Sequence, residues 1–284
     1  MGFERATIEF LLRAGSSGIS MAHVLTIGRQ SMHVQARQLR EQLARHGKTL
    51  DQGAVERLLT EERGFCEPFL RLIGAGKIDS MDFSPYEGAT VLQDMNQPLP
   101  EERHRRYSLV IDGGSIEHVF HYPQALKNCM NATAVGGHFV TITPANNLLG
   151  HGFYQISPEL LFRALSEANG FEVTHMILFE HPWDSTWYEV IDPELARSRV
   201  ELINTRPAYL IACAKRTAEK PIFAAAPQQS DYSAIWEETA GTTVGVEHTA
   251  SRPMPSWRRF LPQGAIRWYR IFQPFRPRLY KRIG

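Results

Sequence analysis

From residue 77 onward, short apolar runs alternate with segments of helical period. Runs with the composition of strands cover 77–84, 88–95, 107–115, 136–144, 171–180 and 208–216, and helical period covers 120–133 and 157–169. In the later helical segment, Ser157 stands as N-cap, Pro158 at the first helical position and Gly170 just past the end. Strands that alternate with helices predict a parallel sheet covered on both faces.

The first 76 residues depart from this regular alternation. Residues 3–14 have helical spacing, "AHVLTIG" at 22–28 has the composition of a buried strand, and residues 33–73 predict two or three helices, the second capped by Asp51. From Gly28 to Asp82 is 54 positions, whereas a crossover with one helix needs roughly 20. The sequence therefore predicts a helical insertion at about 31–75.

Composition changes after Arg216. Residues 217–251 are polar and small, as in a linker, and residues 252–284 contain nine Lys or Arg, no acidic residue and many aromatics. Such a tail suits an anionic membrane surface, packing on its own domain or on a protein partner, or, as the weaker alternative, nucleic acid. The whole chain has 284 residues, 43% of them hydrophobic, and its net charge of +1 indicates no partner. Residues 1–216 suit one α/β domain.

Cysteine usage and the N-terminus bear on the compartment. Cys66, Cys129 and Cys213 are far apart and form no CxxC pair, which predicts reduced thiols in the cytoplasm. The N-terminal residues lack the order of a signal peptide, and no run reaches the ~18 apolar residues of a membrane span. We expect a cytoplasmic protein, with peripheral membrane contact through the tail as an alternative.

Four motifs, in a fixed order along the chain, indicate which kind of α/β domain this is. They are "SMDFSPYEGA" at 80–89, "VLQDMNQPLP" at 91–100, the block at 107–144 and "GHGFYQISPELLFRALSEANGFEV" at 150–173. The block at 107–144 combines a buried strand "LVID", the turn "GGS", the pair Glu117-His118, Pro123 before a helix, and Gly136-Gly137 before a strand. In order and spacing, residues 22–216 resemble the class I S-adenosylmethionine-dependent methyltransferases, in particular the small-molecule branch.

The resemblance implies a fold and a cofactor. The fold would be an α/β, Rossmann-like sheet of seven strands with helices on both faces, here with a helical insertion after the first strand. The cofactor would be S-adenosylmethionine, with Asp82 accepting hydrogen bonds from the ribose hydroxyls, Asp94 near the adenine amino group and Met95 over the ring. The predicted cofactor-binding residues are Gly28, Arg29, Gln30, Asp82, Phe83, Asp94, Met95, Asp112 and Gly113.

The stretch "HVLTIGRQSM" at 23–32 departs from the family pattern. Of its motif only Gly28 remains, because Thr26, Gln30 and Met32 replace an acidic residue and two glycines. Glycines serve where the backbone must come close to a ligand. Three outcomes are open: Arg29 or Gln30 binds the cofactor carboxylate by side chain, the fold is a non-catalytic binding or scaffold module, or another nucleotide binds. The first is favoured.

Methyl transfer to a hydroxyl needs a group that removes a proton. His118 follows the fourth strand at the edge where ligands bind, and is the preferred base, with His121 and His151 as alternatives. His118 and His121 show no third ligand, so no metal is expected. Tyr154 and Trp183 are positioned to line an acceptor pocket. We predict a methyltransferase for a small-molecule, saccharide or lipid-linked acceptor, with a non-catalytic methyltransferase-like protein as the alternative.

Overall fold

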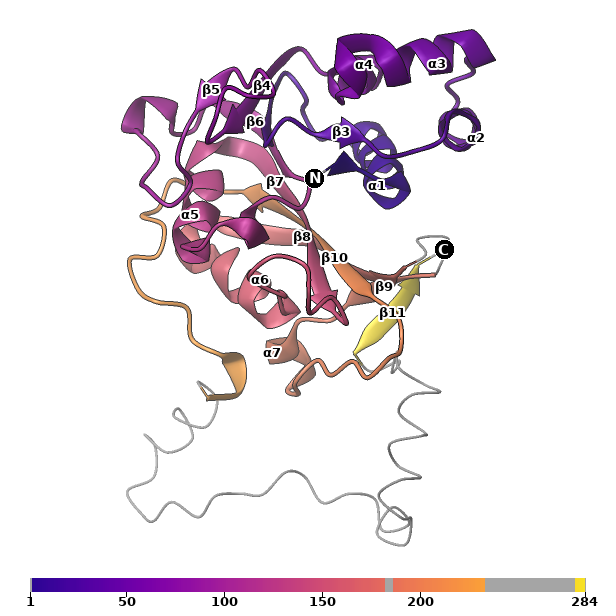
Figure 1. Cartoon of the computed structure of the whole chain (residues 1–284). Coiled ribbons are helices and arrows are strands. Elements are labelled where there is room, and N and C mark those ends of the chain that lie inside the picture. Colours follow the sequence, from indigo (N-terminus) through magenta and orange to yellow (C-terminus); the bar gives the residue numbers. More distant parts are fainter. Residues whose placement is uncertain (1, 182–185, 233–278, 284) are drawn as a thin grey trace, which may run out of the picture.

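A computed structural model describes residues 2–181, 186–232 and 279–283, and most of its strands form one large sheet (Figure 1). The nine-stranded sheet has the order β11-β9-β8-β10-β7-β6-β2-β4-β5. These strands are β2 His23–Ile27, β4 Lys77–Asp82, β5 Val91–Leu92, β6 Tyr107–Asp112, β7 Thr133–Asn146, β8 Phe171–Glu180, β9 Trp187–Val190, β10 Ala208–Arg216 and β11 Tyr280–Ile283.

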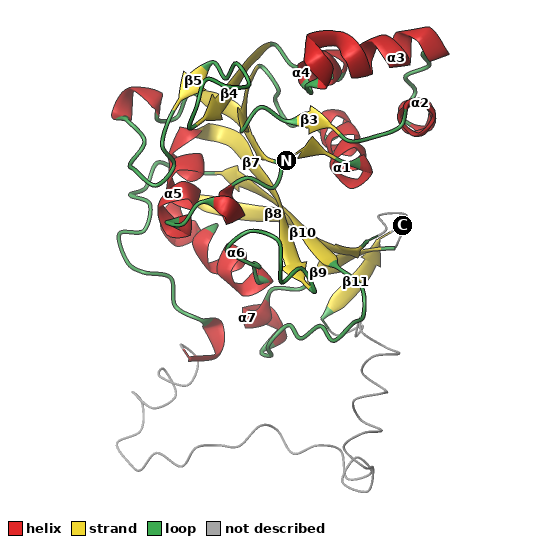
Figure 2. Ribbon diagram, in the orientation of Figure 1, coloured by secondary structure: helices red, strands yellow, loops and turns green. Residues whose placement is uncertain are grey.

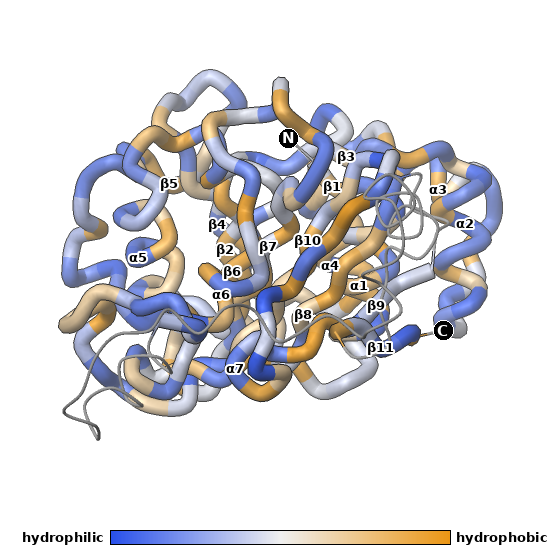
Figure 3. The backbone as a smooth tube through the Cα atoms, turned by 90° about the horizontal axis from the view of Figure 1, so that it is seen from below, coloured by the Kyte–Doolittle hydropathy of each residue, from blue (hydrophilic) through white to orange (hydrophobic). Residues whose placement is uncertain are grey.

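Helices cover both faces of this sheet (Figure 2). They are α1 Arg5–Ser16, α2 Ala36–Arg45, α3 Gln52–Thr60, α4 Glu67–Leu72, α5 Tyr122–Ala132, α6 Pro158–Ala164 and α7 Pro193–Ala196, with short 3-10 turns η1 Glu61–Gly64, η2 Glu101–Arg103, η3 Ile116–His118 and η4 Glu167–Asn169. Alternate residues of β2 enter different cores: Val24 packs with α1, α2 and α4, and Leu25 packs with α5 and α6. Apolar residues accordingly follow the strands through the middle of the molecule (Figure 3).

The fold class expected from the sequence is confirmed by the strand order. Five parallel strands, β5-β4-β2-β6-β7, have the doubly wound arrangement in which the first strand of the set, β2, lies in the middle. The order reverses between β2 and β6, and ligands of such sheets bind outside the carboxyl ends of the strands at that switch point.

The sheet differs in two respects from the parallel, seven-stranded sheet expected from the sequence. β10 runs antiparallel between β7 and β8, and β9 and β11 extend the sheet by two further antiparallel strands. β9 is a four-residue strand, too short for a clear periodic pattern, and β11 belongs to the stretch assigned to the tail.

The region between β2 and β4 is largely helical, as expected. It contains α2, α3 and α4, and Asp51 caps α3 by accepting a hydrogen bond from the Ala54 N–H at 2.7 Å. A small additional sheet was not expected: β1 (Gly2–Phe3) pairs in parallel with β3 (Ser31–Met32) directly after β2. The N-terminus is thereby held beside the carboxyl edge of the main sheet.

The helix expected at 157–169 is confirmed at both ends but divided in the middle. The Ser157 hydroxyl accepts a hydrogen bond from the Leu160 N–H at 3.3 Å, and Gly170 adopts a left-handed conformation with φ of 75°. Between them, α6 ends at Ala164 and a separate turn, η4, begins at Glu167.

The expected linker and tail are described only in part. Residues 217–232 of the linker contact the domain, since Ile222 is buried in the core and the Ser230 N–H donates to Glu159. In the tail, β11 pairs with β9, while residues 252–278 lie outside the described part of the chain, so the predictions of a membrane, nucleic-acid or partner surface there stay predictions. None of the helices in the described ranges combines the length and apolar character needed to cross a bilayer.

Candidate functional site

Two predicted residues lie on neighbouring strands at the carboxyl edge of the sheet. Gly28 follows β2 with φ of 72°, and its N–H donates to the Met81 carbonyl at 2.6 Å. Asp82 ends β4 one residue later. Gly28 and Asp82 therefore meet beside the switch point, which is where the resemblance places the cofactor.

The four predicted residues around β4 and β5 differ in accessibility. Asp82 is half-buried, and one of its carboxylate oxygens accepts the Ser84 N–H at 3.1 Å, whereas the Phe83 side chain is exposed. Asp94 accepts two hydrogen bonds from Asn96, both at 2.9 Å, and Met95 is buried in the core. Asp94 thus stabilises its own turn and Met95 packs the interior, and their roles toward a cofactor remain predictions.

Arg29 binds carboxylates of the protein itself. Its guanidinium donates to Glu67 at 2.6 Å, to Glu62 at 3.0 Å and to the Glu87 carbonyl at 3.0 Å, and it lies over the Phe65 ring at 4.3 Å. Glu62, Phe65 and Glu67 all come from the helical insertion. Arg29 already pairs with two carboxylates of the protein, and its binding of a cofactor carboxylate stays a prediction.

Gln30 fills the space at the switch point. Its side chain is fully buried and its amide donates to the Ile27 carbonyl and to the Ser115 hydroxyl, the latter at 3.0 Å. A Cβ atom on Gly113 would lie only 2.7 Å from the Gln30 side-chain oxygen. Gln30 therefore occupies the crevice between the loops that follow β2 and β6, and its carbonyl oxygen has no hydrogen-bond partner there.

Asp112 holds the turn after β6. The carboxylate is fully buried and accepts hydrogen bonds from the Ser115 N–H at 2.9 Å, the Ile116 N–H at 3.3 Å and the Thr141 hydroxyl at 2.7 Å. Burial raises the pKa of Asp112 to about 6, although these hydrogen bonds favour its ionised form. Its contacts are those of a structural residue, and contact with a cofactor stays a prediction.

A cavity of about 410 Å³ adjoins this turn. It lies between the N-terminal segment and the carboxyl ends of β6, β7 and β8, and its lining includes Glu4, His33, Gly113, Glu117, His118 and His151. Such a volume suits a small molecule. The sequence analysis missed two lining residues, Glu4 and His33. They lie at the cavity because β1 pairs with β3, and no local sequence pattern predicts that pairing.

The structure brings together two of the three predicted histidines. The rings of His118 and His151 are 5.1 Å apart at their centroids, and burial and His151 together lower the pKa of His118. His121 does not line the cavity and its N–H donates to Asn96. Tyr154 does not line it either, and its hydroxyl donates to the Phe120 carbonyl. Trp183 lies outside the described residues.

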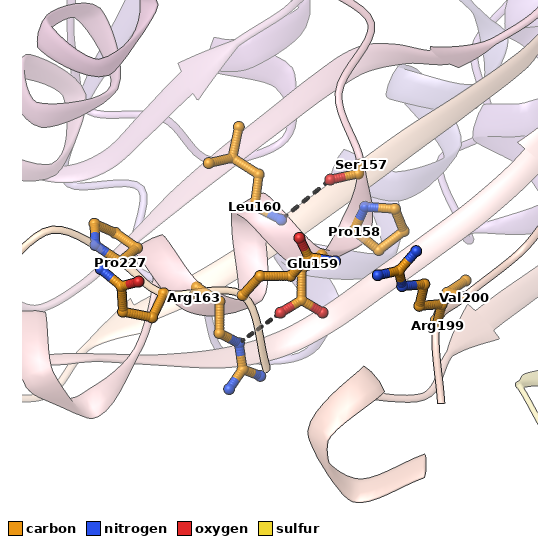
Figure 4. A pocket seen from close by; sticks show the side chains of 10 residues that line it. Ser157, Pro158, Glu159, Leu160, Arg163, Arg199, Val200 and Pro227 are labelled. Carbon is orange, nitrogen blue, oxygen red and sulfur yellow. Dashed lines mark hydrogen bonds and ion pairs between the residues drawn. The ribbon is translucent and has the colours of Figure 1, made fainter. Parts of the chain in front are cut away.

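A second cavity, of about 390 Å³, lies beside the N-terminus of α6 (Figure 4). Glu159 and Arg163 point toward one another in it, and Arg163 also bonds Asp192 and Glu194, while Arg199 pairs with Asp231. Its charged groups are therefore mutually compensated, and no predicted site residue lines it.

Comparison with known proteins gives similarities among solved structures alone. No family model matches the sequence, and no curated protein matches it. The chain is similar to an S-adenosylmethionine-dependent methyltransferase from Mesorhizobium loti, with 15% identity, a TM-score of 0.40 and coverage of 72% of this chain and 95% of that one. It is also similar to the N-methyltransferase NodS from Bradyrhizobium japonicum in complex with S-adenosylhomocysteine, with 15% identity, a TM-score of 0.40 and coverage of 76% and 88%.

Proposed function

We propose that this protein is an S-adenosylmethionine-dependent methyltransferase. The observation that carries the proposal is the placement of Asp82 at the end of β4 beside the left-handed turn at Gly28, at the switch point of a doubly wound sheet. One oxygen of Asp82 accepts a backbone N–H, and within the described residues the other has no partner, so it is available to ribose hydroxyls.

The adjoining cavity supplies a place for the acceptor. S-adenosylmethionine, when bound, provides the electrophilic methyl group, and the protein has to orient the acceptor and take up its proton. His118 lines the cavity, and its lowered pKa keeps the imidazole neutral and able to accept a proton near pH 7. A cavity of about 410 Å³ favours a small-molecule acceptor, or the reacting end of a saccharide or lipid-linked one.

Calorimetry with S-adenosylhomocysteine tests the cofactor site. The folded wild-type chain should bind, and Asp82→Ala should weaken binding at least about tenfold, because a pair of hydrogen bonds to a charged acceptor is lost. Asp51→Ala is the matched control: it removes an aspartate that caps α3 in the insertion and should leave the affinity unchanged. An Asp82→Ala affinity equal to the wild type would contradict the assignment of the ribose site.

The burial of the Gln30 side chain in the crevice favours a second candidate function, a non-catalytic methyltransferase-like binding protein. The crevice that a cofactor would enter already contains a fully buried side chain with two hydrogen bonds. If the folded wild type binds no S-adenosylhomocysteine at millimolar concentration, the enzyme proposal fails and this alternative stands.

A further inference from the structure

Three side chains with metal-ligating atoms meet on one wall of the cavity. Glu117, His118 and His151 each offer an atom, and these atoms all lie within 4.8 Å of one another. One Glu117 carboxylate oxygen is 4.0 Å from His118 Nε2 and 3.5 Å from His151 Nε2. Two imidazoles and a carboxylate around one point form a recurrent ligand set for divalent transition metals.

Glu117 gives an independent indication of a cation. Its side chain is fully buried, and neither carboxylate oxygen has a hydrogen-bond partner. Burial without a hydrogen-bond partner makes the ionised form of Glu117 costly, and the nearby buried Asp112 increases that cost by repulsion. A positive ion beside Glu117 would offset both penalties, and the two histidines are placed to hold it there.

The backbone around the cluster fixes its members against each other. The Phe153 N–H donates to the Glu117 carbonyl at 2.9 Å, and the His151 N–H donates to the Leu148 carbonyl at 2.9 Å. Gly152 has φ of 69°, and a Cβ atom there would lie 3.0 Å from the Glu117 carbonyl oxygen and 3.3 Å from His118 Nδ1. The glycine therefore allows the loop that carries His151 to lie directly on η3, which carries the other two side chains.

We propose that Glu117, His118 and His151 bind a divalent first-row transition-metal ion of the Zn²⁺ class. Imidazole suits such ions, whereas Mg²⁺ and Ca²⁺ prefer sites made of oxygen atoms alone. Ligand atoms about 2.0–2.1 Å from a tetrahedral ion lie about 3.3 Å apart. The histidine side chains are 42% and 43% exposed, so their rings can turn by the small amount needed while Glu117 stays in place.

The inference revises the expectation drawn from the sequence. His118 and His121 were the spaced pair in the sequence, and no third ligand was evident. The third ligand comes from the loop after β7, at His151, and His121 takes no part. With a metal ion bound, His118 would hold the ion instead of accepting a proton, and the ion would lie at the wall of the cavity that the proposed function assigns to the acceptor.

Zinc titration of the full-length chain, stripped with EDTA and dialysed, tests the site. Calorimetry should show one Zn²⁺ bound per chain with a micromolar or lower Kd, and Zn²⁺ should raise the melting temperature. His118→Ala and His151→Ala should each weaken Zn²⁺ binding at least about tenfold, since even the loss of a supporting residue costs that much at metal sites. Both histidines are partly exposed, so these variants should fold.

His121→Ala is the matched control. It removes an exposed histidine three positions from His118 that takes no part in the cluster, and it should bind Zn²⁺ as the wild type does. No stoichiometric binding by the wild type, or equal affinity in the wild type and both cluster variants, would overturn the proposal. The result is independent of S-adenosylhomocysteine binding, so failure of the metal site and failure of the methyltransferase assignment can be told apart.

Discussion

The side-chain amide of Gln30 donates a hydrogen bond to the Ser115 hydroxyl at 3.0 Å, across the point where the strand order of the sheet reverses. Ser115 in turn donates to the Ile27 carbonyl at 2.6 Å, so the loops after β2 and β6 are tied by side chains. If glycine stood at position 30, the crevice between these two loops would be open to a ligand. With Gln30 at this position, internal hydrogen bonds occupy the space that a glycine would leave open.

Removing the Gln30 side chain should open that space. Gln30→Ala loses two hydrogen bonds and should lower the free energy of unfolding by about 1–2 kcal/mol. If the crevice is the cofactor site, its affinity for S-adenosylhomocysteine in calorimetry should rise several-fold. Gln42→Ala is the control, because Gln42 is also buried with an unpartnered side-chain oxygen, but it belongs to α2 and bonds the Arg5 carbonyl. A Gln30→Ala affinity no higher than that of Gln42→Ala would place the cofactor elsewhere.

Gly113→Ala should destabilise the protein through Gln30. The new methyl group would lie 2.7 Å from the Gln30 oxygen, and overpacking of this kind costs about 1–3 kcal/mol. In a double-mutant cycle measured by urea unfolding, the same change in the Gln30→Ala background should cost at least about 1 kcal/mol less. Equal costs in the two backgrounds would show that the crowding has another source.

Arg216 should contribute strongly to stability. It is 2% exposed, at the end of β10, and one guanidinium nitrogen donates to the carbonyls of Met130, Asn131 and Thr133 at the C-terminus of α5. Arg216→Met leaves these carbonyls without that donor and should lower the free energy of unfolding by about 2–4 kcal/mol. Lys215→Met, at the adjacent exposed position of β10, should change it by less than about 0.5 kcal/mol. Similar losses in both variants would argue against the capping role.

Asp79 should affect stability in acid. Burial acts to raise its pKa, but hydrogen bonds from His23 and Lys77 outweigh burial, and the pKa lies below its ordinary value. The folded state then binds fewer protons than the unfolded state, so this contribution is complete above the ordinary pKa and is lost as pH falls through the lower, folded value. Urea unfolding between pH 6 and pH 3 should show a shallower loss of stability for Asp79→Asn than for the wild type. Glu41→Gln, on the exposed surface of α2, should keep the wild-type slope.

Local patterns were sufficient for most elements of the domain. The strands at β2, β4, β6, β8 and β10 and the caps at Asp51 and Ser157 were predicted because period, branching and capping side chains act over a few residues. The break between α6 and η4 was missed because Leu165 and Ser166 carry no helix-breaking signal. The antiparallel direction of β10 was missed because a strand's composition does not specify its partners.

The candidate site was predictable only in outline. Gly28 and Asp82 lie near one another because the carboxyl ends of parallel strands meet at one edge of the sheet, and their roles toward a cofactor stay predictions. The internal partners of Arg29, Gln30 and Asp112 could not be predicted, since each is reached across the fold and not along the chain. His151 lies on the loop after β7, and α5 and β7 separate it from Glu117 along the chain, so no local pattern could predict that the two are close.

The position of β10 has a consequence for synthesis. It fits between β7 and β8, both of which are translated earlier, and Arg216 at its end completes the cap of α5. Until residues 208–216 leave the ribosome, each of those two older strands lacks its inner neighbour and presents open backbone groups. In the interval between completion of β8 and emergence of β10, the nascent chain therefore presents strand edges that can pair with other unfinished chains.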